Sequence, residues 1–235
     1  YYETTARTWE RAAFIRARPI AGNLAFGHEF LAKIEPFIWR HSLDYSVVGY
    51  LQNWLRHLPI PDKFFGFDVK LGAYGIRHVE LIAHILQLIG GGRNISLRTN
   101  KTRNALLSLE SCKSLEDGQS KRLIASYYAW RPIEHRLQYQ RDAHTHKLPK
   151  TEAEFTLFAH FLGFKTSDEL RDNLLTLQSY TKLAASHPLL DRMMFQHLNQ
   201  AQSDAEMPLV NADLVTDWLT DLGFQNPEQI HLTIE

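Results

Sequence analysis

Residues 68–93 read DVKLGAYGIRHVELIAHILQLIGGGR, and this stretch decides the fold of the chain. Glycines punctuate both ends of a helix that is expected over 74–89. At about 100° per residue, apolar side chains cover nearly all of its circumference and leave one narrow polar line. The polar line consists of Arg77, Glu80, His84 and Gln87. Because a helix that is apolar on most sides is normally buried, this segment is predicted to lie in the core.

The polar line has two interpretations, and the residues leave both open. Arg77 and Glu80 are three positions apart, so they can pair with each other and bond to neighbouring helices. Alternatively, the line faces a cleft, because a buried polar line needs either protein partners or a ligand.

The rest of the chain is predicted to be helical nearly throughout. Pro36 is expected to mark a break or the first turn of a helix, and Pro132 a kink or a restart. Pro59 and Pro61 lie in a loop over 58–62. No region alternates between apolar and polar residues as a half-buried strand does. The fold class is therefore all-α, a helical bundle. Its helices are expected over 2–18, 28–57, 74–89, 100–109, 119–144, 151–163, 166–186 and 189–200.

Two helix starts have a specific signature, the capping box. Thr151 is followed three residues later by Glu154, and Thr166 by Glu169. In such a box the hydroxyl accepts from the amide of the third helical residue, and the carboxylate accepts from the amide of the capping residue. Gly163 is expected to end the helix between the two boxes.

Composition excludes several classes of protein. The 26 basic residues and 26 acidic residues cancel, so no overall field attracts nucleic acid. No apolar run approaches the roughly 20 residues that a membrane span requires. The single cysteine, Cys112, excludes an intramolecular disulfide framework and is expected to be a small, semi-buried apolar side chain.

Four ordered blocks carry a resemblance to a known family. Residues 70–93 resemble KLGxGGIREIEF…QLIxGGR, and residues 1–18 resemble YYE..GR.WER…IKAR. Residues 36–45 resemble PFVYRRYLDY, and residues 134–149 resemble EHRLQ…THTLP. These motifs are typical of the bacterial glutamine synthetase adenylyltransferase/adenylyl-removing family. The last two blocks resemble the first of its two fused halves, which removes AMP from glutamine synthetase.

The resemblance implies an architecture and a set of partners. Residues 1–22 would be the last helix of a nucleotidyltransferase domain, 23–202 a helical bundle of the substrate-binding type, and 203–235 an acidic helical connection to the second half. Alternatively, that acidic end is simply a solvated helical face. The implied partners are glutamine synthetase, the PII signal protein and an upstream nucleotidyltransferase domain, all cytoplasmic. No nucleic acid or membrane is expected.

The resemblance also shows what this sequence lacks. Family members carry the catalytic Gly-Ser turn and the Asp-x-Asp pair before the YYE block, where this sequence begins. Asp44 and Asp62 are the only aspartates before position 68, and neither forms such a pair. Clustered carboxylates are needed to hold magnesium against phosphates. The chain is therefore expected to be an excised or processed piece that is inert alone, with Mg²⁺ and ATP or ADP bound only in the parent enzyme.

The resemblance and the charge pattern together suggest phosphate-binding residues. Arg7, Arg11 and Arg18 share a helix face, which by itself indicates exposure to solvent. Arg16 lies on the side of Trp9, where a charge needs a partner. It occupies the lysine position of the family's KAR triplet. The full predicted set for nucleotide or phosphate binding is Arg7, Arg11, Arg16, Arg18, Lys70, Arg77 and Glu80.

The chain departs from the family pattern at three positions. His78 replaces the first Glu of GIREIEF, Tyr74 replaces the preceding Gly, and Ala6 replaces the Gly of GRxWER. His78 is expected to project into the apolar arc of its helix. If the family's first Glu helps catalysis, this copy would be slow or altered.

Glu134 lies on an otherwise apolar stripe with Tyr127 and Trp130. A structural ion pair with an arginine of a neighbouring helix is one interpretation, and a substrate contact is the other. The predicted set for substrate or domain contact is Glu134, His135, Arg136 and Gln138. No metal site is expected, because no ligand spacing completes His144 and His146. The alternative function is a non-catalytic helical interaction module.

Overall fold

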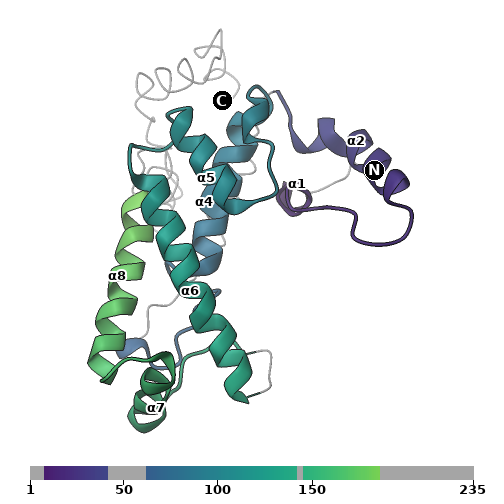
Figure 1. Ribbon diagram of the computed structural model, residues 1–235. Helices are drawn as coiled ribbons and strands as arrows, with labels where there is room; N and C mark the ends of the chain where they lie inside the picture. Colours follow the sequence, from purple (N-terminus) through teal and green to yellow (C-terminus); the bar gives the residue numbers. More distant parts are fainter. Residues whose placement is uncertain (1–7, 42–61, 142–144, 186–235) are drawn as a thin grey trace, which may run out of the picture.

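The computed structural model describes residues 8–41, 62–141 and 145–185, and in these ranges it is helical with no strand. An isolated antiparallel bridge joins Asp68 to Lys147. The all-α prediction is therefore confirmed. The elements are α1 (Thr8–Phe14), α2 (Leu24–Ile38), η1 (Asp62–Phe64), α4 (Ile76–Gly90), η2 (Ile95–Leu97), α5 (Thr102–Ser111), α6 (Gln119–Arg141), α7 (Glu152–Leu162) and α8 (Ser167–Ala185) (Figure 1).

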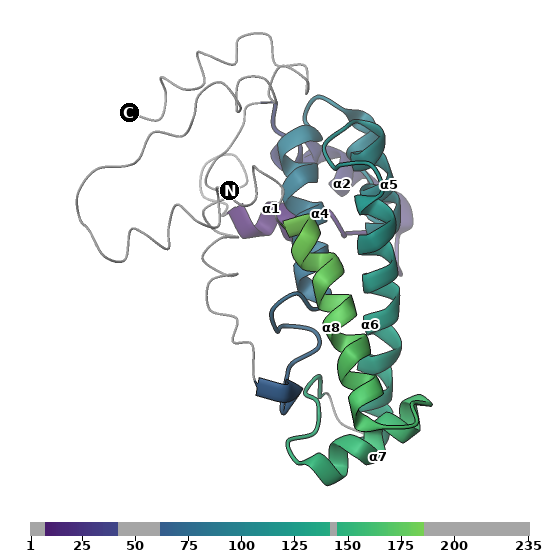
Figure 2. The same ribbon diagram turned by 90° about the vertical axis from the view of Figure 1, so that its left-hand side faces the viewer.

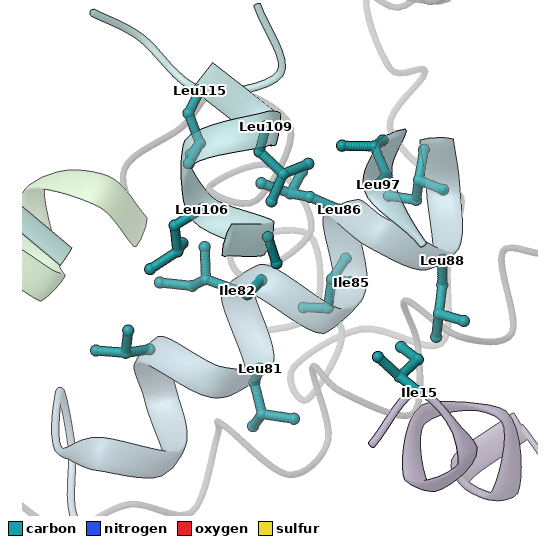
Figure 3. Close-up of a cluster of buried hydrophobic side chains, with 14 of the residues drawn as sticks. Ile15, Leu81, Ile82, Ile85, Leu86, Leu88, Leu97, Leu106, Leu109 and Leu115 are labelled. Atoms are coloured by element: carbon teal, nitrogen blue, oxygen red, sulfur yellow. The ribbon is translucent and has the colours of Figure 1, made fainter. Parts of the chain in front are cut away.

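Helix α4 is the centre of the fold, as its sequence predicts. All of its residues except Arg77 are buried. It contacts α1, α5, α6 and α8. Figure 3 shows Ile82, Leu86 and Leu88 of α4 among side chains of α5 and of the segment after α1. Such burial on nearly every side stabilises the bundle by roughly 1.5–3 kcal/mol per large apolar side chain.

The buried side chains around α4 form one hydrophobic cluster. A second hydrophobic cluster lies around the C-terminal part of the long helix α6. Trp130, Ile133 and Leu137 of α6 pack there against α7, α8 and the segment that begins at Phe64. Helices α6 and α8 lie side by side along much of their length (Figure 2). Tyr127 of α6 touches both clusters, so the middle of α6 marks the junction between them.

Helix ends largely follow the predicted signals. The Thr151 hydroxyl accepts from the Glu154 amide at 3.4 Å, and the Thr166 hydroxyl accepts from the Glu169 amide at 3.1 Å. The second half of each box differs from the prediction. The carboxylate of Glu154 accepts from the Thr151 hydroxyl, and that of Glu169 accepts from the Lys165 amide. Gly163 ends α7 at φ +92°, a left-handed conformation that glycine adopts without strain.

Several predicted boundaries were wrong. Helix α1 ends at Phe14, four residues before Arg18. Helix α2 begins at Leu24 because the Asn23 side chain caps it, and it continues through Pro36. Helix α6 also continues through Pro132, which is exposed on that helix. The helices predicted over 42–57 and 189–200, the loop over 58–61 and the acidic end 203–235 lie outside the described residues.

Candidate functional site

A network of charged side chains surrounds Glu80, which lies one turn into α4. Its side chain is 6% exposed. Oε1 of Glu80 lies 2.9 Å from Nη1 of Arg16, 3.0 Å from Nη2 of Arg131 and 3.3 Å from the Tyr127 hydroxyl. Oε2 lies 3.3 Å from Nη1 of Arg77. A buried carboxylate is costly without partners, and here the segment after α1, α4 itself and α6 all supply them.

A second buried carboxylate, Glu134 of α6, continues the network. Its side chain is 3% exposed, and it pairs with Arg131 at 2.8 Å and Lys70 at 3.3 Å. Nδ1 of His146 lies 3.4 Å from Oε1 of Glu134, without a hydrogen bond in the described part of the chain. Burial raises the pKa of a carboxyl group. The hydrogen bond and charge of Arg131, with the charge of Lys70, outweigh burial and hold the pKa of Glu134 below its usual value.

Arg131 joins the two carboxylates. Its Nη1 donates to Glu134, while its Nη2 donates to Glu80 and, at 2.7 Å, to the Tyr127 hydroxyl. Its guanidinium carbon also lies 4.9 Å from the centre of the Tyr127 ring. Burial disfavours the charged form, but the hydrogen bonds to Tyr127 and Glu134 raise the pKa of Arg131, which stays charged. The network is therefore continuous from Arg16 to His146.

The segment before α4 is folded tightly enough to bring Lys70 to this network. Oδ1 of Asp68 accepts from the amides of Lys70 and Leu71 at 3.0 and 2.8 Å. A Cβ on Gly72 would lie 2.5 Å from the Phe67 ring and closer still to the Asp68 carbonyl. Only glycine fits at this position, so the turn depends on it.

A second segment, residues 145–149, is hydrogen-bonded to the same turn. The Val69 amide donates to the His146 carbonyl at 2.9 Å, and the Leu148 amide donates to the Phe67 carbonyl at 2.8 Å. These bonds bring His146 beside Glu134, near the same oxygen, Oε1, that Lys70 approaches. Two sequence blocks that lie about 75 positions apart thus meet at one carboxylate.

The network carries a surplus of positive charge. Among the described residues, Arg16, Lys70, Arg77 and Arg131 face the carboxylates of Glu80 and Glu134, so four positive charges meet two negative ones. Their side chains are 28–45% exposed, whereas the carboxylates are buried. Cations that are held from behind by buried acids and partly open to solvent can bind an anion such as a phosphate.

Two histidines of α4 are buried beside this network and are neutral. Burial lowers the pKa of His78 to about 4, and its Nδ1 accepts from the Tyr74 amide at 3.1 Å. Burial, followed by the charge of Arg16, lowers the pKa of His84 to about 4. His78 thus lies in the apolar arc as predicted. Gln87, the last residue of the polar line, donates to the carbonyls of Leu97 and Thr99.

The structure brings together five of the residues singled out in the sequence: Arg16, Lys70, Arg77, Glu80 and Glu134. Their contacts show that the Arg77–Glu80 pair exists and bonds to neighbouring elements, as the first interpretation of the polar line states. Arg18 is exposed, with no hydrogen bond or ion pair within the described part of the chain. Arg7 lies outside the described residues.

The predicted exposure of Arg11 was wrong. This side chain is 2% exposed, and its Nε and Nη2 donate to the Ile38 carbonyl at 3.4 and 3.2 Å. Ile38 is the last residue of α2, where carbonyls lack helical donors. Arg11 therefore caps α2 from α1, and this placement removes it from the set that can meet a phosphate.

The residues predicted around Glu134 separate in the structure. Nη1 of Arg136 donates to the Leu162 carbonyl at the end of α7, at 3.1 Å. His135 is exposed and Gln138 half-buried, and among the described residues neither side chain forms a hydrogen bond or ion pair with the two carboxylates. The expected arginine partner of Glu134 was placed on a neighbouring helix, but Arg131 lies on the same helix, three residues earlier.

Sequence reasoning missed four members of the network: Thr102, Tyr127, Arg131 and His146. The spacing of Arg131 and Glu134 at i,i+3 was the signal available for one of them. Within the described ranges no group of three or more His, Cys, Asp or Glu residues could hold a metal ion. In the same ranges no helix is long and apolar enough to cross a membrane.

The sequence matches two protein-family models. Residues 51–195, more than half of the chain, match the model described as GlnD PII-uridylyltransferase. Residues 1–33 match the model described as glutamate-ammonia ligase adenylyltransferase.

Curated relatives share a single description, bifunctional glutamine synthetase adenylyltransferase/adenylyl-removing enzyme. The protein of Agrobacterium fabrum is 36% identical over 246 residues, covering 100% of this chain and 24% of its own length. That of Xanthobacter autotrophicus is 40% identical over 184 residues, covering 75% of this chain and 18% of its own length. The protein of Rhizobium meliloti is 36% identical over 242 residues, covering 98% of this chain and 24% of its own length.

The chain spans about a quarter of the length of the curated relatives that match all of it. The matches to both family models and to these relatives agree with the motifs of the four sequence blocks. This chain belongs to the family of bifunctional glutamine synthetase adenylyltransferase/adenylyl-removing enzymes.

Proposed function

We propose that this chain is the helical substrate- and regulator-binding part of a glutamine synthetase adenylyltransferase. It would support removal of AMP from a glutamine synthetase tyrosine by phosphorolysis, and adenylylation of that tyrosine. The observation that carries the proposal is the convergence of three family-like blocks on one charged network. Arg16 comes from the first block, Lys70, Arg77 and Glu80 from the second, and Glu134 and His146 from the last.

The chemistry of phosphorolysis fits cations held in this way. An oxygen of orthophosphate attacks the phosphorus of the AMP group, the bond from phosphorus to the tyrosine oxygen breaks, and a proton from orthophosphate ends on that tyrosine. The products are ADP and free tyrosine. Negative charge on the phosphoryl oxygens must be stabilised throughout, and Arg16, Arg18, Lys70 and Arg77 would do so.

The proposed reaction needs magnesium, but the described residues of this chain would not supply its ligands. Mg²⁺ prefers carboxylate and phosphate oxygens, and when bound it would neutralise charge on the phosphates. Glu80 and Glu134 are each engaged by arginines, so neither is an open ligand. The metal and the nucleotide would be held chiefly by a nucleotidyltransferase domain, and this chain alone would be inert.

Two protein partners follow from the same proposal. The curated relatives are named for their action on glutamine synthetase, which would be the substrate protein here. The PII signal protein would be the regulator, as the family resemblance implies. The network lies at the junction of two hydrophobic clusters. Binding at either end of the bundle could therefore influence it.

A chimaeric enzyme tests the proposal directly. The segment of the Agrobacterium fabrum relative that matches this chain is replaced by the chain, and the chimaera is mixed with adenylylated glutamine synthetase, orthophosphate and Mg²⁺. We expect ADP release, and we expect a large loss of it with Arg16→Met or Arg77→Met. A folded chimaera without ADP release would contradict the proposal, and a helical interaction module would then be the better account.

The claim of inertness has its own test. The 235-residue chain is mixed alone with the same three components. ADP release by the isolated chain would show that it contains a complete catalytic centre.

A further inference from the structure

We infer that Arg131 is the positioning residue of the anion site: it holds Glu80, and through Glu80 the guanidinium groups of Arg16 and Arg77, in the orientation that receives a phosphate-bearing substrate. This inference rests on the proposed function and deepens it. The family resemblance quoted for the sequence begins at Glu134, so it assigns no role to Arg131.

The first step of the argument is connectivity. Within the described residues, Arg131 is the side chain that bonds both buried carboxylates. Glu80 pairs with Arg16 and Arg77, and Glu134 pairs with Lys70. Arg131 therefore links every cation of the site. Without it, each carboxylate would keep its own cations but would lose its fixed distance from the other.

The second step is geometry. Glu80 and Glu134 accept from two different nitrogens of Arg131, at 3.0 and 2.8 Å, and the Tyr127 hydroxyl accepts at 2.7 Å. A guanidinium is a planar fork whose donors have fixed directions, and it can also lie over an aromatic ring, as it does over Tyr127. A lysine ammonium is a point charge on a flexible stem, so it cannot span both carboxylates in this way.

The third step is the consequence for the two cations that face solvent. Oε1 of Glu80 accepts from Arg131 and Arg16, and Oε2 accepts from Arg77. Loss of Arg131 frees the Glu80 carboxylate to rotate, and both guanidinium groups then follow it. The net charge of the cluster also falls by one. Charge-assisted contacts depend strongly on such geometry, so anion binding should weaken even when the charge is preserved.

The ligand class follows from the cations. Among the described residues the cluster has two more positive than negative charges, and three of its four cations are arginines, whose donors have fixed directions. A phosphate monoester or orthophosphate, with two negative charges near pH 7 and several acceptor oxygens, matches both the charge and the geometry. Orthophosphate is therefore the probe for the test.

The experiment measures binding of orthophosphate to the full 235-residue chain by calorimetry, with ³¹P resonance as a second readout. The variants are Arg131→Lys and Arg131→Met, and the matched control is Arg122→Lys. Arg122 lies exposed on the same helix, and its side chain has no hydrogen bond or ion pair in the described ranges. We expect both Arg131 variants to weaken binding by tenfold or more and the control to change it less than twofold.

A double variant separates positioning from a merely structural role. In Arg131→Lys the lysine can satisfy one carboxylate and leaves the other with fewer partners. Adding Glu134→Gln removes the charge of one carboxylate, so the lysine can pair with Glu80 alone. Orthophosphate binding should then return to within about threefold of the wild type. Urea unfolding of each variant checks that the chain is folded before binding is measured.

The outcomes are distinguishable from failure of the proposed function. If folded Arg131→Lys binds orthophosphate as well as the wild type, or if the wild-type chain binds none, the inference is overturned. The chimaera assay reports on the proposed function independently, because a chimaera that releases ADP upholds that function whatever Arg131 does. The chimaera can also be inactive while the 235-residue chain binds orthophosphate and needs Arg131 to do so. That result would contradict the proposed function and support the anion site.

Discussion

Arg16, just after α1, meets Glu80 of α4 at 2.9 Å, although 64 positions separate them in the sequence. The same nitrogen of Arg16 also donates to the Thr102 hydroxyl of α5 at 3.2 Å. One side chain thus joins three helical regions around a buried carboxylate. The sequence placed Arg16 on the apolar side of the first predicted helix, where a charge needs a partner. That partner is Glu80 of the central helix α4.

Glu80→Gln should destabilise the chain. The carboxylate pairs with three arginines and accepts a hydrogen bond from Tyr127. An amide keeps the shape but leaves those cations to repel one another, and hydrogen bonds to charged groups contribute about 2 kcal/mol. We expect the free energy of unfolding in urea to fall by about that amount.

Glu29→Gln is the matched control for that substitution. Glu29 pairs with Lys33 at 2.7 Å, but both side chains are largely exposed. Exposed pairs of this kind contribute about 0–1 kcal/mol. Equal losses from the two substitutions would show that the burial of Glu80 has no energetic consequence.

Arg16→Lys should cost much less chimaera activity than Arg16→Met. Both described contacts of Arg16 use one nitrogen, Nη1, so a single ammonium could reach Glu80 and Thr102. The family motif has lysine at this position, in agreement with that geometry. The rate of ADP release at fixed orthophosphate is the measurement. Equal losses from the two variants would mean that the guanidinium shape, and not only its charge, is required.

Acid should destabilise the chain through His78 and His84. The pKa of each is about 4 when folded, against 6.5 as the ordinary value. As pH falls below 6.5 the unfolded chain binds these protons first, so stability is lost between pH 6.5 and pH 4. At pH 5 the loss is about 2 kcal/mol per histidine.

Urea unfolding at pH 7 and pH 5 measures this loss. The His78→Gln, His84→Gln double variant should show a smaller difference between the two pH values than the wild type. A double variant with the full wild-type difference would place the acid sensitivity in other groups.

Gly72→Ala should both destabilise the fold and weaken phosphate binding. The added methyl group would overlap the Phe67 ring and the Asp68 carbonyl, which costs about 1–3 kcal/mol. The turn that would have to move carries Lys70 to Glu134. Gly118→Ala is the comparison. Gly118 has φ +83°, but a Cβ added there would meet no atom within 4 Å. The substitution should therefore lower the free energy of unfolding by about 1 kcal/mol and leave phosphate binding intact. Phosphate binding that is unaffected by Gly72→Ala would separate this turn from the site.

Local signals predicted the features that depend on neighbours along the chain. The apolar circumference of 74–89 indicated the buried helix α4, and Thr151 and Thr166 marked the starts of α7 and α8. Proline was a poorer guide. Pro36 and Pro132 lie inside continuous helices, because packing on either side outweighs the one hydrogen bond that each removes.

The candidate site could be predicted only in part. Arg16, Arg77 and Glu80 were found, because two of them share a helix line and the third is a charge on an apolar face. Arg131 was not singled out in the sequence, since its role depends on α4 lying opposite. Arg11 looked exposed for the converse reason, because the end of α2 covers it.

The sequence by itself determined that this chain is helical, that α4 is its core, and which family it resembles. Those properties follow from periodicity, capping residues and ordered motifs, all of which act over a few residues. Tertiary structure decided which arginines are open to solvent and which are caps, and that Glu80 and Glu134 share one guanidinium. A side chain's charge environment is set by the elements that pack across from it, and those are distant along the chain.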